Sequence, residues 1–182
     1  MTTAPSFGRV YDRLKAAIGG WAHVRRMPLR RLKSLIKDAG LSHQKAPRIK
    51  AILRKLEADF GRPSLGPLRR MDDAAAERYL TTLPGVGVKT AKCVMMYSLG
   101  REVLPVDTHV WRVARRLGLV GGGVPYLRVH SALEAVVAPG DRYVFHVNAL
   151  SHGRVVCTAL RPKCWACPLR PMCPYPASHR PT

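Results

Sequence analysis

The chain has 182 residues, of which 47% are hydrophobic, so it is long enough for one globular domain or two small ones, and it contains no apolar run that could span a membrane. Its 31 Lys and Arg residues against 11 Asp and Glu give a formal net charge of +20 at pH 7, which favours a polyanionic partner, DNA or RNA first, over a merely solvated basic surface or an anionic membrane. Residues 1–8 lack the basic-then-apolar pattern of a secretion signal, so we expect a cytoplasmic protein.

Apolar residues at helical spacing recur along most of the chain. The first such stretch, residues 29–36, keeps its Lys and Arg off the apolar face and is followed by Gly40, a natural C-terminal stop. Asp72 and Asp73 give a later stretch an acidic start, which suits the helix dipole. Residues 103–106 are the only candidate strand and have no second strand to pair with. The sequence therefore predicts an all-α fold with short connections, with helices over residues 29–36, 49–60, 73–80, 88–99, 110–117 and 143–156.

Residues 83–91 (LPGVGVKTA) join two of these helices through a turn that contains two glycines. The glycines allow a tight turn and a close approach of a ligand, and the amides that open the next helix form an anion site. Neither common nucleotide motif fits, because Val88 stands where a Walker A loop needs glycine and Thr90 stands where a dinucleotide fingerprint needs its third glycine. The stretch is either a helix-hairpin-helix that grips a DNA phosphate through backbone amides or an ordinary interhelix turn.

Asp107 stands directly before the apolar-periodic helix that follows, in the stretch VDTHV over residues 106–110. Spacing alone favours an N-cap role for this carboxylate. By the same reasoning His109 is an ordinary, partly buried histidine.

Four of the five cysteines fall in one run, with the spacing C-x6-C-x2-C-x5-C. Disulfides are disfavoured in a chain without an export signal. A structural zinc site usually has two Cys-x2-Cys pairs and this run has one, whereas four thiolates in one uneven loop suit a [4Fe–4S] cluster. The chemistry favours iron–sulfur and leaves a zinc-bound basic interaction module as an alternative. The ligands would be Cys157, Cys164, Cys167 and Cys173, and Cys93 is interpreted as a small buried residue.

Together, the hairpin and the segment over residues 106–112 (VDTHVWR) resemble the endonuclease III family of DNA glycosylase/AP lyases, and the resemblance extends from about residue 9 to residue 175. It implies that Lys89 is the nucleophile and Asp107 the essential carboxylate. Adenine-excising relatives have Ser at the Lys position and Gly-Asn after the Asp, so the chain is similar to the lyase-competent branch. The family has the same cysteine spacing, which implies a [4Fe–4S] cluster.

The chemistry of such an enzyme suits these residue types. A carboxylate stabilises the positive charge that develops on the sugar as the glycosidic bond breaks. A neutral amine attacks C1′, displaces the base and forms a Schiff base, and β-elimination then cleaves the strand. The resemblance implies a monomeric, nucleoid-associated bacterial enzyme that removes damaged, above all oxidised, pyrimidines from duplex DNA, with the target base flipped out of the helix.

The resemblance also implies which residues contact DNA. The hairpin would hold a phosphate, the cysteine loop would present a cation, and a leucine after a glycine would wedge opposite the lesion. For this leucine, a hydrophobic contact after a helix end is an equally good interpretation. The residues concerned are Gly85, Val86, Gly87, Thr90, His109, Lys163 and Leu41.

By the same resemblance the chain has a helical barrel domain over residues 5–107, with the hairpin at 83–91, and a cluster domain over residues 108–182, with its loop at 157–173. The family begins upstream with two further helices and a Leu-Ser-Gln segment, so we expect the N-terminal helices to be missing here. An alternative function follows from this expectation: a non-catalytic iron–sulfur DNA-binding protein, inactive through the loss of those helices.

Overall fold

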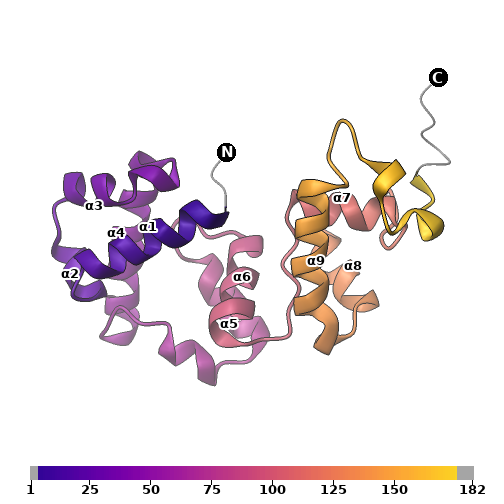
Figure 1. The fold of residues 1–182 in the computed structure, drawn as a ribbon. Helices are drawn as coiled ribbons and strands as arrows, with labels where there is room; N and C mark the ends of the chain where they lie inside the picture. The colour runs from indigo at the N-terminus through magenta and orange to yellow at the C-terminus, as the bar shows by residue number, and fades with distance from the viewer. Residues whose placement is uncertain (1–3, 176–182) are drawn as a thin grey trace. The chain divides into compact units, whose positions relative to one another are not determined.

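The computed structural model describes the backbone of residues 4–175 and the side chains of residues 8–175. Within this range the chain forms α-helices joined by loops and short 3-10 turns, without a strand (Figure 1), which confirms the all-α prediction. None of the described helices is both long and apolar enough to cross a membrane. The helices are α1 (Ala4–Ala17), α2 (Trp21–Arg26), α3 (Leu29–Leu35), α4 (Ser42–Phe60), α5 (Asp73–Thr81), α6 (Val88–Leu99), α7 (Thr108–Arg116), α8 (Val129–Val136) and α9 (Arg142–Val155).

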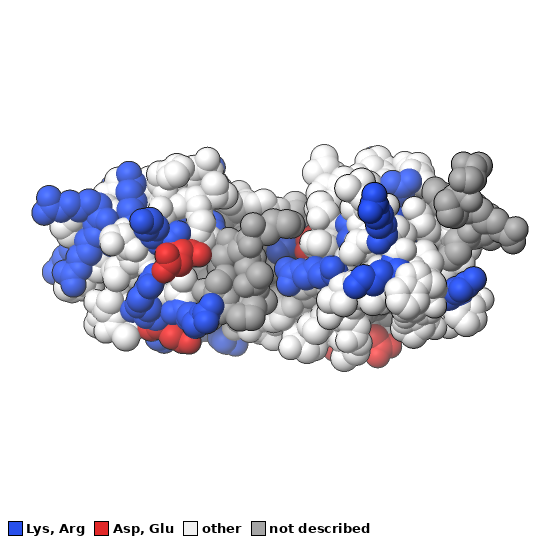
Figure 2. All heavy atoms as spheres, turned by 45° about the horizontal axis from the view of Figure 1, so that its top comes forward, with Lys and Arg blue, Asp and Glu red and all other residues white. Residues whose placement is uncertain are grey.

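The chain divides into two compact units, residues 1–86 and residues 87–182. The division into a barrel and a cluster domain after residue 107 is a different one and stays a prediction. Figure 2 shows Lys and Arg side chains over the visible face of each unit, with few Asp or Glu side chains among them. Both units therefore contribute to the positive surface charge.

In the unit of residues 1–86, α2 and α3 pack against the long helix α4. Gly40, which ends the 3-10 turn Lys37–Ala39, has a φ of 69°, and Gly61 after α4 has a φ of 70°. Both glycines lie where the sequence predicts helix ends, in conformations that favour glycine. The core of this unit contains Val10, Leu14, Ile18, Val24, Met27, Leu32, Ile36, Ala39, Ala46 and Leu53.

In the unit of residues 87–182, α7 and α9 form the closest helix pair. A Cβ atom at Gly153 of α9 would lie 2.9 Å from the Cβ and 3.1 Å from the carbonyl oxygen of His109 in α7, so only glycine allows this approach. The core of this unit contains Leu104, Val106, Val110, Val113, Ala114, Val120, Val129, Leu133 and Ala149.

All six predicted helices are present, and α4 begins at Ser42 instead of residue 49. Sequence periodicity did not predict α1, α2 or α8, and α2 and α8 are only 6 and 8 residues long. Residues 103–106 are buried, as an apolar run should be, but they form an extended connection without a partner strand. This connection leads directly to Asp107.

Candidate active site and cysteine centre

Residues 83–87 form a tight turn in the chain between α5 and α6. Gly85 has a φ of 77°, a conformation that favours glycine, and the absence of a Cβ atom there leaves room for the side chain of Arg48. Helix α6 begins at Val88, and its N-cap residue Gly87 supplies no side-chain cap. The amides of the first turn of α6 are therefore available to an anion.

Lys89 lies in that first turn, and its side chain is exposed. Its ammonium group has no hydrogen bond or ion pair with the residues that the structure describes. Lys92, one turn further along α6, is buried, and its Nζ lies 2.8 Å from Oε1 of Glu134. Of the two lysines on α6, Lys89 is the one that a ligand can reach.

Asp107 is the N-cap of α7 and is half-buried. Its Oδ1 accepts the backbone N–H groups of His109 and Val110, each at 2.9 Å, which confirms the N-cap interpretation. Both bonds end on the same oxygen, and within the described residues Oδ2 has no protein donor. The cap thus orients the carboxylate while one oxygen stays available for a substrate, so the two interpretations of Asp107 are compatible.

His146 of α9 was not singled out by the sequence. Its ring is buried, and Nδ1 lies 2.7 Å from the carbonyl oxygen of Pro105, two residues before Asp107. Burial lowers the pKa of His146, the bond to Pro105 raises it, the negative charge of Asp107 raises it and the positive charge of Lys89 lowers it. Among the smaller influences on this pKa, Asp107 and Lys89 therefore act in opposite directions.

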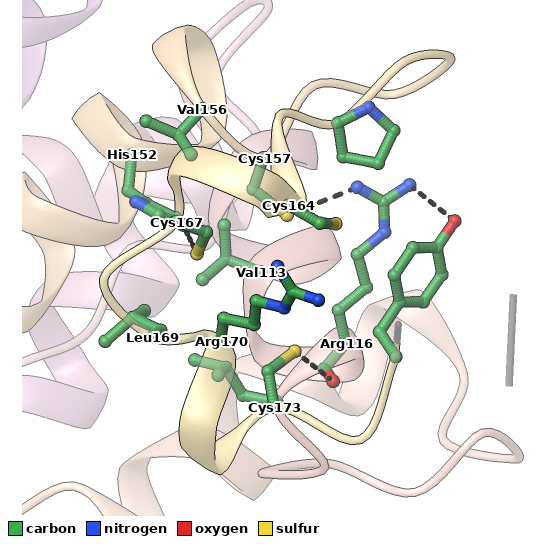
Figure 3. Close-up of a pocket in the computed structure, with 13 residues that line it drawn as sticks. Val113, Arg116, His152, Val156, Cys157, Cys164, Cys167, Leu169, Arg170 and Cys173 are labelled. Atoms are coloured by element: carbon green, nitrogen blue, oxygen red, sulfur yellow. Dashed lines mark hydrogen bonds between the residues drawn. The ribbon is translucent and has the colours of Figure 1, made fainter. Parts of the chain in front are cut away.

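The four clustered cysteines line a single pocket (Figure 3), formed by α7, the end of α9 and the loop of residues 157–173, called the cysteine loop below. All of them are free thiols. Nε2 of His152 lies 3.6 Å from Sγ of Cys167, and burial lowers the pKa of this imidazole. The rest of the lining is largely apolar and includes Val113, Leu117, Val156 and Leu169.

Arg116 of α7 organises this loop, a role that no sequence pattern indicated. One terminal nitrogen donates to Sγ of Cys157 at 3.2 Å and to the carbonyl of Thr158 at 2.8 Å. The other donates at 3.1 Å to the Tyr175 hydroxyl, and the guanidinium lies 4.1 Å from the centre of that ring. The backbone carbonyl of Arg116 also accepts the Cys173 thiol at 3.3 Å. One residue therefore contacts both ends of the cysteine loop.

Four thiols around one pocket are a donor set that a [4Fe–4S] cluster can use. Among the described residues, no three His, Cys, Asp or Glu side chains lie close enough together to hold one metal ion. In a [4Fe–4S] cluster each thiolate binds a different iron atom, so the four sulfurs surround a larger body, as the four thiols do around this pocket.

The predicted DNA contacts lie in different environments. In the hairpin, Gly85, Gly87 and Thr90 are exposed and Val86 is half-buried; Lys163 is also exposed. Leu41 is 59% exposed and has a φ of 54°, which is unusual for a residue other than glycine. His109 instead packs on Gly153, with Nδ1 3.1 Å from Arg112. The role of each in DNA binding stays a prediction.

Residues 2–139 match the model of the family described as HhH-GPD superfamily base excision DNA repair protein. The chain is 36% identical over 147 residues to endonuclease III of Bacillus subtilis, covering 81% of this chain and 63% of the relative. It is 30% identical over 175 residues to DNA glycosylase/AP lyase ROS1 of Arabidopsis thaliana, covering 87% of this chain and 13% of the relative.

A solved structure described as a trapped endonuclease III–DNA covalent intermediate superimposes with a TM-score of 0.81 at 29% identity, covering 97% of this chain and 79% of that one. The chain spans less than two thirds of the curated relatives it matches, 63% of the endonuclease III above and 9% of the plant protein ROS1A of Oryza sativa subsp. japonica.

Proposed function

The chain belongs to the HhH-GPD superfamily of base excision DNA repair proteins, as the resemblance of its motifs to the endonuclease III family predicts, and from this premise we propose that it is a DNA glycosylase with AP-lyase activity. Its substrate is duplex DNA that carries damaged bases, oxidised pyrimidines above all, or abasic sites. It acts on this DNA as a monomer.

One observation carries the proposal. Lys89 is exposed in the first turn of α6, directly after the two-glycine turn, and has no described protein partner, while Asp107 caps α7 with one carboxylate oxygen free of described protein donors. An accessible amine nucleophile and an accessible carboxylate are the two groups that a glycosylase/lyase reaction requires.

The reaction follows from these groups. Asp107 stabilises the positive charge that develops on the sugar as the bond between C1′ and the base breaks, and the departing base takes up a proton. The neutral amine of Lys89 forms a bond to C1′, and ring opening gives a Schiff base. Loss of the C2′ proton then breaks the bond from C3′ to its phosphate oxygen. The amides of the hairpin hold a backbone phosphate meanwhile.

We further propose that Cys157, Cys164, Cys167 and Cys173 hold a [4Fe–4S] cluster. The thiols line one pocket, and Arg116 donates to one of the four sulfurs. A bound cluster supplies four cross-links that fix the cysteine loop. The chain itself then presents the exposed side chain of Lys163 to DNA phosphate.

Borohydride trapping tests the function. The full chain, purified with its cluster, is mixed with a duplex that contains one abasic site, and sodium borohydride reduces the Schiff base to a stable adduct. We expect an adduct with the wild type, none with Lys89→Met, and a much slower reaction with Asp107→Asn. Lys37→Met, which removes an exposed lysine from the unit of residues 1–86, is the matched control and should trap normally.

Iron–sulfur protein is brown, so its colour shows whether the cluster is present. The absence of any adduct with folded, brown protein would overturn the proposal. If such protein still bound DNA with a steep salt dependence, the non-catalytic alternative would be favoured instead. Colourless protein that contains zinc would overturn the cluster assignment. The glycosylase assignment would then depend on the trapping result alone.

A further inference from the structure

The connection between α6 and α7, residues 102–106, carries Asp107 at its end and is called the Asp107 segment below. Residues 103–106 are buried and belong to neither a helix nor a strand. Buried N–H and C=O groups need hydrogen-bond partners, and an extended chain without a neighbouring strand must find them elsewhere. The partners of this segment show what holds the catalytic carboxylate in place.

Side chains from later elements supply these partners. The carbonyl of Glu102 accepts from Arg142 at 2.5 Å, and the carbonyl of Leu104 lies 3.2 Å from Nδ1 of His130. The next two carbonyls, of Pro105 and Val106, are 2.7 Å from Nδ1 of His146 and 3.2 Å from the hydroxyl of Tyr126. Three later elements thus fix the backbone before Asp107: the 3-10 turn Tyr126–Arg128, α8, and α9 through its first residue Arg142 and through His146.

Glu134 of α8 differs from the other partners because it also contacts α6. Its Oε1 accepts the backbone N–H of Leu104 at 2.7 Å and the ammonium of Lys92 at 2.8 Å. Lys92 lies three residues after Lys89 on the same helix, and its side chain is only 8% exposed. One carboxylate oxygen therefore joins the helix that carries the nucleophile to the segment that carries Asp107.

A bond of this kind has a strong effect on geometry. A charged pair taken out of water loses much of its hydration, so it is retained only with good geometry and additional hydrogen bonds. Glu134 has both, since its ionised oxygen accepts one charged and one backbone donor. Loss of the carboxylate would remove the acceptor of the buried Leu104 N–H and the shared oxygen that joins it to Lys92, and the two elements would be free to move apart.

We propose that Glu134 is a positioning residue for the reaction. It sets the placement of the Asp107 carboxylate relative to the Lys89 amine and touches neither of them. This inference rests on the proposed function, because it concerns how two groups reach one sugar carbon. A misplacement of 1 Å in such an arrangement lowers a rate by roughly 100-fold.

The test compares Glu134→Ala and Glu134→Gln with the wild type, as the full chain with its cluster. Single-turnover trapping on a saturating abasic duplex gives the rate of the chemical step. The dissociation constant of a duplex with a tetrahydrofuran analogue gives binding. We expect Glu134→Ala to trap roughly 30-fold more slowly with binding changed less than about threefold. Glu134→Gln should recover part of the rate, since its amide oxygen can accept from Leu104.

The second arm repeats Glu134→Ala in the Asp107→Asn background. If Glu134 acts by placing the carboxylate, the added loss in this background should be under about twofold, because the group to be placed is already changed. An equal loss in both backgrounds, or an unchanged rate in Glu134→Ala alone, overturns the proposal. Glu57→Gln, which removes the charge of an ion pair with Arg25 in the unit of residues 1–86, is the matched control and should trap at the wild-type rate.

Two measurements keep this test separate from the proposed function. Wild type and Lys89→Met establish whether the protein forms an adduct through that lysine at all. Hydrogen exchange of the Leu104 amide, measured without DNA, should be at least about tenfold faster in Glu134→Ala, and an unchanged exchange rate counts against the proposal. If Glu134→Ala does not fold, Glu134→Gln combined with Lys92→Met removes both charges and is measured in the same way.

Discussion

The Asp107 segment and the cysteine loop are both irregular chain, and they are held in opposite ways. The Asp107 segment is buried, and five side chains satisfy its backbone. The cysteine loop has a few backbone turns of its own, and three of its large apolar side chains, Leu160, Trp165 and Met172, are 94%, 80% and 72% exposed. Protein side chains hold the Asp107 segment in place. The cysteine loop instead has its thiols around a pocket and few buried apolar side chains.

The difference is consistent with two separate functions, placement of a carboxylate and presentation of cations to DNA. If Asp107 is catalytic, as proposed, its carboxylate must be placed before the substrate arrives, and direct bonds to its segment would do this. A loop that presents cations to phosphate needs only a stable outline, which cross-links through a cluster can provide. Helix α7 joins the two regions, because Asp107 caps its first turn and Arg116 in its last turn contacts the cysteine loop.

Removal of one of the proposed cluster ligands should give the largest difference in hydrogen exchange between the two regions. Cys167→Ser loses a thiolate, so we expect colourless protein in which amides of the cysteine loop exchange at least roughly 100-fold faster, because the loop then opens at little cost. Amides of residues 103–106 should change less than about threefold. Hydrogen exchange measured by mass spectrometry checks both regions at once. Equal acceleration in both would show that the Asp107 segment also depends on the cluster.

Arg116→Met should have the next largest effect. It leaves the carbonyls of Thr158 and Ala159 without their guanidinium donor and removes the contact with Tyr175. Hydrogen bonds to a charged group contribute about 1.5–3 kcal/mol each, so we expect a loss of about 3 kcal/mol after allowance for partial exposure. Urea denaturation measures it.

Arg116→Lys is the comparison for this prediction. A lysine keeps the charge but cannot donate in the planar fork that reaches Thr158, Ala159 and Tyr175 together. It should therefore recover less than half of the lost stability. Full recovery would mean that charge alone, and not the pattern of donors, holds the loop.

Gly153→Ala tests the helix pair that underlies both regions. The new methyl group would lie 2.9 Å from Cβ of His109, so α7 and α9 must separate, at a cost of about 1–3 kcal/mol. The helix propensity of alanine offsets up to about 1 kcal/mol of this. A net loss of roughly 1 kcal/mol in thermal unfolding is expected. Gly140→Ala, where a Cβ meets no atom within 4 Å, is the control and should leave stability nearly unchanged.

Several of these features follow from local sequence. Gly40, Gly61 and Gly100 mark helix ends because each must adopt a positive φ, which restricts the residue type. The spacing of the four cysteines and the two hairpin glycines is equally local. These patterns predict the all-α fold, the pocket of thiols and the N-cap role of Asp107.

The partners of the Asp107 segment could not be predicted in this way. His130, Glu134 and His146 lie 26, 30 and 41 residues from the backbone groups they contact. A single residue that bonds across such a distance leaves no periodic pattern. The apolar run 103–106 correctly predicts burial, but its candidate strand is wrong because side chains, not a second strand, satisfy its backbone.

The smallest expected effect is a change of pH dependence at His146, which tests whether the Asp107 segment is held by a neutral ring. Burial is the main cause that lowers its pKa below the ordinary 6.5; the charges of Lys89 and Arg154 lower it further, the Pro105 bond and the charge of Asp107 raise it, and Tyr97 packs edge-on against the ring. Because the unfolded chain takes up this proton at a higher pH than the folded one, stability is full above about pH 6.5 and falls as the pH drops from there toward the lowered folded pKa.

His146→Asn should flatten this fall, because its amide N–H can donate to the Pro105 carbonyl in place of Nδ1 but does not titrate. Urea denaturation of both proteins from pH 7.5 to pH 5 measures the difference. His152, whose pKa burial also lowers, contributes to both curves, so their difference isolates His146. If the two curves run parallel, the ring is not held neutral in the folded protein, and the Asp107 segment is then held by a charged donor, as the cysteine loop is by Arg116.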